Sequence, residues 1–128
     1  MNERLLFKAS AIVEILTGLA FLAAPTLVVG LLLGGGLGST GVAVARVLGI
    51  GLVSIGIAGW ELLEQEIRLA PRAGLCLYNV GAALVLGMLG TYGGMSGILL
   101  WPAVVLHALI GAMMLRVIFA ASQKVAAE

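Results

Sequence analysis

The chain has 128 residues, of which 62% are hydrophobic and 10% are charged, and its formal net charge is +1. Soluble domains carry roughly 25% charged residues, so this chain has too few charged side chains to cover a soluble surface. Intrinsic disorder is excluded by the same composition, and a net charge near zero provides no basic surface for nucleic acid. The sequence therefore predicts an all-α integral membrane protein that is embedded in the lipid bilayer.

The second half of the chain contains a long stretch without Asp, Glu, Lys or Arg. This stretch covers 43 residues, 73–115, which fits two membrane crossings of roughly 20 residues with a turn between them. Gly93, Gly94 and Gly97 mark the turn. Pro102 is tolerated in the first turn of the following helix, because the N–H group that it lacks would have no partner there.

The first half contains a similar charge-free stretch, 15–45, which a proline and several glycines interrupt. Pro25 is expected to end the first span. The apolar segment Thr26–Leu33 then forms a short helix, which lies at the membrane interface or packs on the bundle. The glycines within 34–41 connect this helix to the second span. The first span contains Glu14 and lacks a clear cleavage site, so we expect it to be retained rather than removed as a signal peptide.

These features predict a single transmembrane domain over residues 1–128. It is an all-α, integral membrane four-transmembrane-helix bundle, with a short interfacial helix after the first span. The predicted spans lie at about 5–24, 42–63, 73–92 and 98–119, lengths that suit a hydrocarbon core of roughly 30 Å.

Lysine and arginine are distributed unevenly around the four spans. Six of the seven basic residues fall on the side of the two termini and only Arg46 falls on the other: the six are Arg4, Lys8, Arg68, Arg72, Arg116 and Lys124. The positive-inside rule then predicts that both termini lie in the cytoplasm. Glu64 and Arg68, spaced i,i+4 in a cytoplasmic loop, form either a solvated helix end or a docking surface. Trp60 and Trp101 are expected at opposite interfaces.

Each predicted span carries one polar residue that its apolar neighbours do not explain: Glu14, Arg46, Asn79 and His107. Small residues lie on the same helix faces as these polar residues. Examples are Gly87, which lies further along the face of Asn79, and Gly111, which lies one turn after His107. Small residues permit close approach of helices. We therefore expect the four polar side chains to point into the bundle and the leucine and valine faces to contact lipid.

Glu14 and His107 are each about nine residues into their helices, which places both near the middle of the membrane. An ionised carboxylate is costly in hydrocarbon, so Glu14 is protonated, paired or in contact with water. His107 and Arg46 are its candidate partners. Glu14 is either part of a structural pair that holds two helices in register or a site for a proton or cation.

The other polar residues have simpler expected roles. Arg46 extends to the outer interface unless it reaches inward to Glu14, and Asn79 forms a hydrogen bond between helices. Tyr78 is expected as an interface ring and Cys76 as a small buried residue. His107 is expected to be a hydrogen-bonded interior residue rather than a metal or haem ligand, because no second ligand lies at suitable spacing on its helix. No cofactor is therefore expected, and no nucleophile arrangement indicates an enzyme.

The segment AIVEILTG, with Glu14 in the middle of the first of four helices, resembles the small multidrug resistance transporters. The resemblance covers the first helix. It implies an antiparallel dimer in which protons and cationic drugs compete for Glu14. The charge bias, which favours a single orientation, and the 5% aromatic content depart from that pattern.

A broader resemblance covers most of the chain. The segments LAAPTLVVGLLLG, ARVLGIGLVSIGIAGW and LLWPAVVLHALIGAMMLR are similar to bacterial four-helix membrane proteins of the DoxX and DUF4345 type. This resemblance implies the four-helix layout, a place in the bacterial inner membrane and no established reaction. Thiol-linked roles suggested for DoxX-like proteins are not expected with Cys76 alone.

Two functions follow from this sequence as hypotheses. The first is a non-catalytic inner-membrane protein that acts through helix association, as a homo-oligomer or an accessory subunit of a larger membrane complex. The second is a small proton-coupled carrier of a small or cationic solute, with Glu14 as the proton site.

Overall fold

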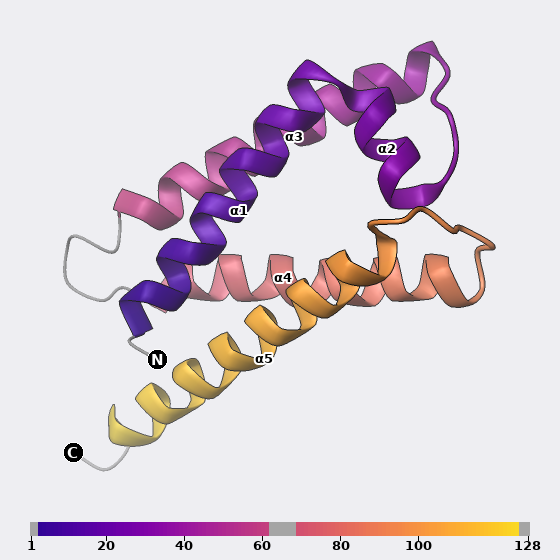
Figure 1. The fold of residues 1–128 in the computed structure, drawn as a ribbon. Coiled ribbons are helices and arrows are strands. Elements are labelled where there is room, and N and C mark those ends of the chain that lie inside the picture. Colours follow the sequence, from indigo (N-terminus) through magenta and orange to yellow (C-terminus); the bar gives the residue numbers. More distant parts are fainter. Residues whose placement is uncertain (1–2, 62–68, 126–128) are drawn as a thin grey trace.

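The computed structural model describes residues 3–61 and 69–125, and in these residues the chain is all-α (Figure 1). Five helices follow one another: α1 (Glu3–Ala23), α2 (Pro25–Leu33), α3 (Ser39–Glu61), α4 (Leu69–Thr91) and α5 (Leu100–Val125). Each predicted helix is present, with ends that differ by a few residues. The largest difference is at the end of α5, which continues past residue 119 because no glycine or proline follows Arg116 to stop it.

Four of the helices are long and apolar enough to cross a membrane: their apolar stretches are Glu3–Ala23, Ser39–Trp60, Arg72–Thr91 and Leu100–Ala120. Each stretch has 20 to 22 residues, which at 1.5 Å per residue spans about 30 Å. That length matches the hydrocarbon thickness of a bilayer. The four predicted spans are thereby confirmed as helices of membrane-crossing length.

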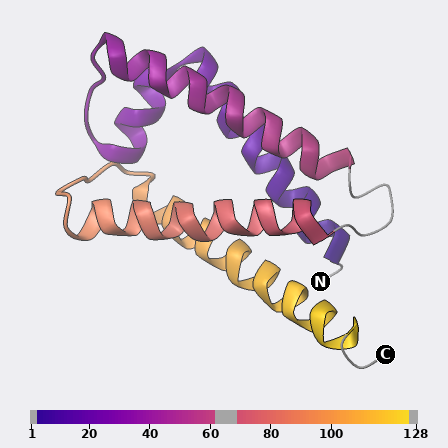
Figure 2. The same cartoon turned by 180° about the vertical axis from the view of Figure 1, so that it is seen from behind.

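The long helices form two antiparallel pairs, α1 with α3 and α4 with α5 (Figures 1 and 2). Packing is extensive within each pair and sparse between the pairs. α2 lies at one end of the molecule and reaches from the first pair to the loop that joins α4 and α5. The four-helix bundle is therefore open between its two halves.

Glycines permit the close contact between α1 and α3. A Cβ atom placed on Gly18 would lie 2.6 Å from the carbonyl oxygen of Gly49, and one on Gly56 would lie 2.7 Å from that of Ala11. In the other pair, a Cβ on Gly111 would lie 2.9 Å from Cγ2 of Val80. These contacts confirm the role of small residues on the packed faces.

The prediction was wrong for Gly87, which is not at a close helix contact. A Cβ atom on Gly87 would meet Val104 at 3.9 Å, an ordinary van der Waals distance. The tight contacts of this helix pair lie on either side of Gly87: at Gly111, beside Val80, and at Gly90, where a Cβ atom would lie 3.1 Å from Leu100.

α2 begins as its sequence predicts. Pro25 occupies its first turn, and the preceding residue, Ala24, has the non-helical angles φ −140° and ψ 61°. The helix ends at Gly34, whose φ of 76° is a conformation that favours glycine. The backbone N–H groups of Ser96 and Leu99 donate hydrogen bonds to carbonyl oxygens at the end of α2, at 3.3 and 2.8 Å. Of the two expected positions, the helix thus adopts the one packed on the bundle.

Two apolar clusters form the core. The first joins the pairs near the termini and consists of Leu6, Phe7, Leu75, Cys76, Ile110 and Met114. The second lies toward α2 and consists of Phe21, Ala45 and Leu52, with Tyr78 among the residues packed against it. Cys76 is 5% exposed, which confirms it as a small buried residue.

The helix ends nearest the two chain termini carry most of the described basic residues. Arg72 lies 3.7 Å from the carboxylate of Glu3, and the ammonium group of Lys8 lies 5.1 Å from the ring centre of Trp60. Trp60 and Trp101 are both partly exposed, one in the last turn of α3 and the other in the first turn of α5. The expected pair of Glu64 with Arg68 falls outside the described residues.

Candidate polar cluster between three helices

Five polar residues from α1, α4 and α5 come together inside the membrane-crossing stretches. We call them the polar cluster: Ser10, Glu14, Tyr78, Asn79 and His107. Three of the four intramembrane residues predicted from the sequence belong to it. α1 contributes Ser10 and Glu14, which are one helical turn apart, α4 contributes Tyr78 and Asn79, and α5 contributes His107.

Asn79 is the centre of the cluster. Its amide nitrogen Nδ2 donates to the carbonyl oxygen of Leu75 and to Oγ of Ser10, both at 2.9 Å. A main-chain carbonyl can only accept, so the bond to Leu75 fixes which end of the amide is the nitrogen. The amide oxygen Oδ1 therefore faces α5. The expected hydrogen bond between helices is confirmed, and it links α4 to both α1 and α5.

His107 lies against that amide oxygen. Its Nδ1 is 3.0 Å from Oδ1 of Asn79, and since Oδ1 is an acceptor, Nδ1 must carry the proton. The ring of Tyr78 meets the imidazole edge to face, with centroids 5.7 Å apart and planes at 82°. His107 is thus an interior residue with a hydrogen bond to another helix, as the sequence predicts.

Glu14 is fully buried, with 0% of its surface exposed. Among the described residues, neither of its carboxyl oxygens has a hydrogen-bond partner. The side chain of Tyr78 interacts with this carboxyl group, in a contact that does not meet the geometry of a full hydrogen bond. A buried polar group without a partner is costly, so this carboxyl group has capacity for a ligand.

Neither predicted partner of Glu14 forms a bond with it. His107 is directed to Asn79 instead, and Arg46 is exposed on the outside of α3. The prediction that Arg46 points inward was therefore wrong. The buried face of α3 consists of Ala45, Gly49, Leu52, Gly56 and Gly59, and Arg46 is about 100° around the helix from Ala45.

Two members of the cluster were not among the predicted site residues. Ser10 is a small residue one turn before Glu14 on α1, and it is fully buried. Tyr78 was expected as an interface ring, which is wrong, because it packs inside against His107 and the second apolar cluster. The sequence position of Tyr78 could have indicated this, because the tenth residue of α4 lies well inside the helix rather than at its end.

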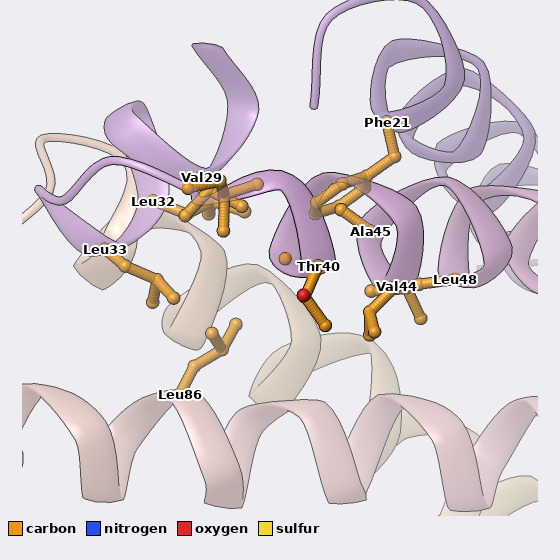
Figure 3. A pocket seen from close by; sticks show the side chains of 11 residues that line it. Phe21, Val29, Leu32, Leu33, Thr40, Val44, Ala45, Leu48 and Leu86 are labelled. Carbon is orange, nitrogen blue, oxygen red and sulfur yellow. The ribbon is translucent and has the colours of Figure 1, made fainter. Parts of the chain in front are cut away.

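An apolar groove opens between α2, α3 and α4, with Phe21 of α1 also in its lining (Figure 3). It encloses about 410 Å³, and Thr40 is its one lining residue with a polar side chain. Leu86 extends toward it from α4, across from the side chains of α2 and α3. Phe21 and Ala45 line the groove and also belong to the apolar cluster on which Tyr78 packs. Tyr78 itself packs on that cluster and does not line the groove.

Within residues 3–61 and 69–125, no group of three or more His, Cys, Asp or Glu side chains could hold a metal ion. The chemistry that the polar cluster offers is that of its own groups, namely the binding and release of protons at Glu14 and His107 and hydrogen bonding at Asn79, Ser10 and Tyr78.

No protein-family model, curated protein or solved structure matches this chain. The function proposed below rests on the residues of this chain.

Proposed function

We propose that this protein is a proton-coupled carrier of a small solute and that Glu14 is its proton site. The observation that carries the proposal is the fully buried carboxyl group of Glu14, whose two oxygens lack hydrogen-bond partners among the described residues. An intramembrane carboxyl group in this state exchanges between a neutral protonated form and an ionised form that needs a counter-charge or water. Exchange between those two forms is what proton coupling requires.

The two-part architecture supports this proposal. Alternating access occurs largely by movement of one rigid part of a carrier against another around a central site. Here the packing is tight within the pairs α1/α3 and α4/α5 and sparse between them. The polar cluster lies at the junction, so movement of one pair against the other changes the surroundings of Glu14.

The apolar groove between α2, α3 and α4 supports a small solute as the cargo. Its volume of about 410 Å³ is within the roughly 300–1,000 Å³ typical of small-molecule sites. We place the carrier in the bacterial inner membrane with both termini in the cytoplasm, because basic residues concentrate at that end of the helices.

Proton counting on the purified protein in lipid nanodiscs tests the proposal. Between about pH 5 and 9, the wild type is expected to release one proton more than Glu14→Gln, which retains the shape of the side chain and cannot titrate. Glu3→Gln is the matched control, because it removes an exposed carboxyl group from the same helix. Equal proton release from the wild type and Glu14→Gln would contradict the proposal.

A second candidate function rests on a different surface. Small and large residues alternate at helical spacing on the outer side of α4: Gly74, Leu77, Gly81, Leu84 and Met88. A Cβ atom on Gly74 or Gly81 would meet nothing within 4 Å, and the three large side chains are 62% to 75% exposed. A face with small residues favours close packing of a further helix. We propose on this basis that the protein associates as a homo-oligomer or as an accessory subunit of a larger membrane complex.

Leucine substitutions at Gly74 and Gly81 test this second function. Both positions are open, so the chain is expected to fold normally while cross-linking into higher species in native membranes is lost. Gly51→Leu is the control, because Gly51 is equally open and lies on α3. Loss of cross-linking in all three variants, or in none, would argue against an interface on α4.

A further inference from the structure

His107 is the one histidine of the chain and is 8% exposed. Its orientation follows from a chain of fixed donors and acceptors that begins at the main chain of α4. The carbonyl oxygen of Leu75 fixes Nδ2 of Asn79, and Nδ2 in turn directs Oδ1 toward the imidazole. The hydrogen bond to Oδ1 then requires a proton on Nδ1.

This assignment determines what the other ring nitrogen can do. A neutral histidine with its proton on Nδ1 has its lone pair on Nε2. Among the described residues, no hydrogen bond involves Nε2 of His107. Nε2 therefore carries a lone pair that has no hydrogen-bond partner among the described residues, while Nδ1 is held by Asn79.

We propose that Nε2 of His107 is a second proton-binding atom of the polar cluster. Asn79 is its positioning residue, because the hydrogen bond from Nδ1 to Oδ1 keeps the ring proton on Nδ1 and leaves Nε2 unprotonated. The inference rests on the proposed function for its first proton site, Glu14. In the coupled step the O–H bond of Glu14 breaks and an N–H bond forms at Nε2. The products are a carboxylate and an imidazolium, so the net charge of the cluster does not change.

The surroundings of His107 favour coupling with Glu14. Besides His107, the polar cluster contains Ser10 and Glu14 from α1 and Tyr78 and Asn79 from α4. Cys76, one turn before Asn79 on α4, has its thiol against the carbonyl oxygen of Gly111. Arg46, the basic residue within the crossing stretch of α3, lies on its outer face. A carboxylate and an imidazolium attract each other strongly in a medium of low dielectric constant. Ionisation of one group therefore assists ionisation of the other.

The experiment uses the full chain in lipid nanodiscs with ¹⁵N-labelled histidine, which yields the signals of a single imidazole. At high pH the wild type is expected to show a proton bonded to Nδ1 and none on Nε2. Asn79→Leu removes the acceptor and should allow the proton to appear on Nε2. Asn79→Asp restores an acceptor and should return it to Nδ1.

Ser10→Ala is the matched control for Asn79. It removes one bond of Nδ2 while the bond to Leu75 still orients the amide, so the proton should remain on Nδ1. A proton on Nε2 in the wild type, or the same tautomer in the wild type and Asn79→Leu, would overturn the positioning role of Asn79.

The same spectra recorded between about pH 5 and 9 test proton binding at Nε2. Nε2 of the wild type is expected to take up a proton in this range, and in Glu14→Gln the uptake should shift to lower pH, with Glu3→Gln unchanged. A histidine that stays neutral throughout, or that titrates identically in Glu14→Gln, would overturn the second site. Proton release by Glu14 is measured separately. A negative result for His107 would therefore overturn the second proton site without contradicting the proposed function.

Discussion

Asn79 bonds to side chains on two other helices, which makes it the residue whose loss should affect the fold most directly within the cluster. Asn79→Leu removes the bonds to Ser10 and His107. Hydrogen bonds between membrane helices contribute about 0.6 kcal/mol on average, and an unsatisfied buried donor costs about 1–3 kcal/mol. We expect the free energy of unfolding to fall by about 2 kcal/mol in total, measured by denaturant titration in detergent.

Ser10→Ala provides the comparison, with an expected loss of about 0.6 kcal/mol for its single bond. If both variants were as stable as the wild type, the hydrogen bonds would not hold the helices together.

Two of the arginines in the membrane-crossing stretches, Arg72 and Arg46, should behave differently. Arg72 is buried, lies 5.1 Å from the ring centre of Phe7 and pairs with Glu3. Arg72→Leu is expected to cost about 1 kcal/mol or more, chiefly through the lost cation–π contact, because the pair with exposed Glu3 contributes little. Arg46→Leu should not lower stability. Thermal unfolding in the same detergent measures both, and a large loss in Arg46→Leu would mean that this side chain has a partner.

Residue patterns predicted part of the polar cluster and missed the rest for a physical reason. Burial of Glu14, Asn79 and His107 follows from the small residues around them. Arg46 has glycines at similar spacing, but a one-residue difference in the position of the buried face turns it outward. Which acceptor binds His107 depends on the relative placement of three helices, and the spacing within one helix does not contain that information.

At the scale of helices, the sequence predicted the elements well because their signals are local. Pro25, Gly34 and the glycines near residue 94 act on their own turns, and the charge-free runs set the lengths of the spans. The packing of α2 on the loop before α5 could not be predicted in this way, because it depends on backbone hydrogen bonds between segments more than 60 residues apart.

The contact between α4 and α5 can be tested with two glycines. Gly111→Leu should disrupt the pair, because even a Cβ atom there would lie 2.9 Å from Val80. Overpacking of this kind typically costs about 1–3 kcal/mol. Gly87→Leu should be mild, since the space around Gly87 accepts a side chain. The yield of monodisperse protein after purification measures the difference, and equal yields would contradict the packing of this pair.

At the scale of the whole molecule, the orientation in the membrane can be tested by labelling. Single cysteines at Ser39 and Ser96 are expected to react with an impermeant thiol reagent added to intact cells, and one at Gln65 is not. Cys76 is buried and should give little background, which Cys76→Ser would remove. Labelling of the residue introduced at Gln65 from outside would reverse the proposed orientation.

The division into two helix pairs also determines the order of assembly during synthesis. α1 and α3 can pack as soon as residue 61 has entered the membrane, while His107 is still 46 residues away. At roughly 5–20 residues per second, this delay lasts about 2–9 s. For that interval Glu14 lacks His107 and the rest of α5, and during the first part of it α4 is also missing. The nascent chain must therefore insert with this carboxyl group protonated or accompanied by water, and the second pair encloses it only at the end of translation.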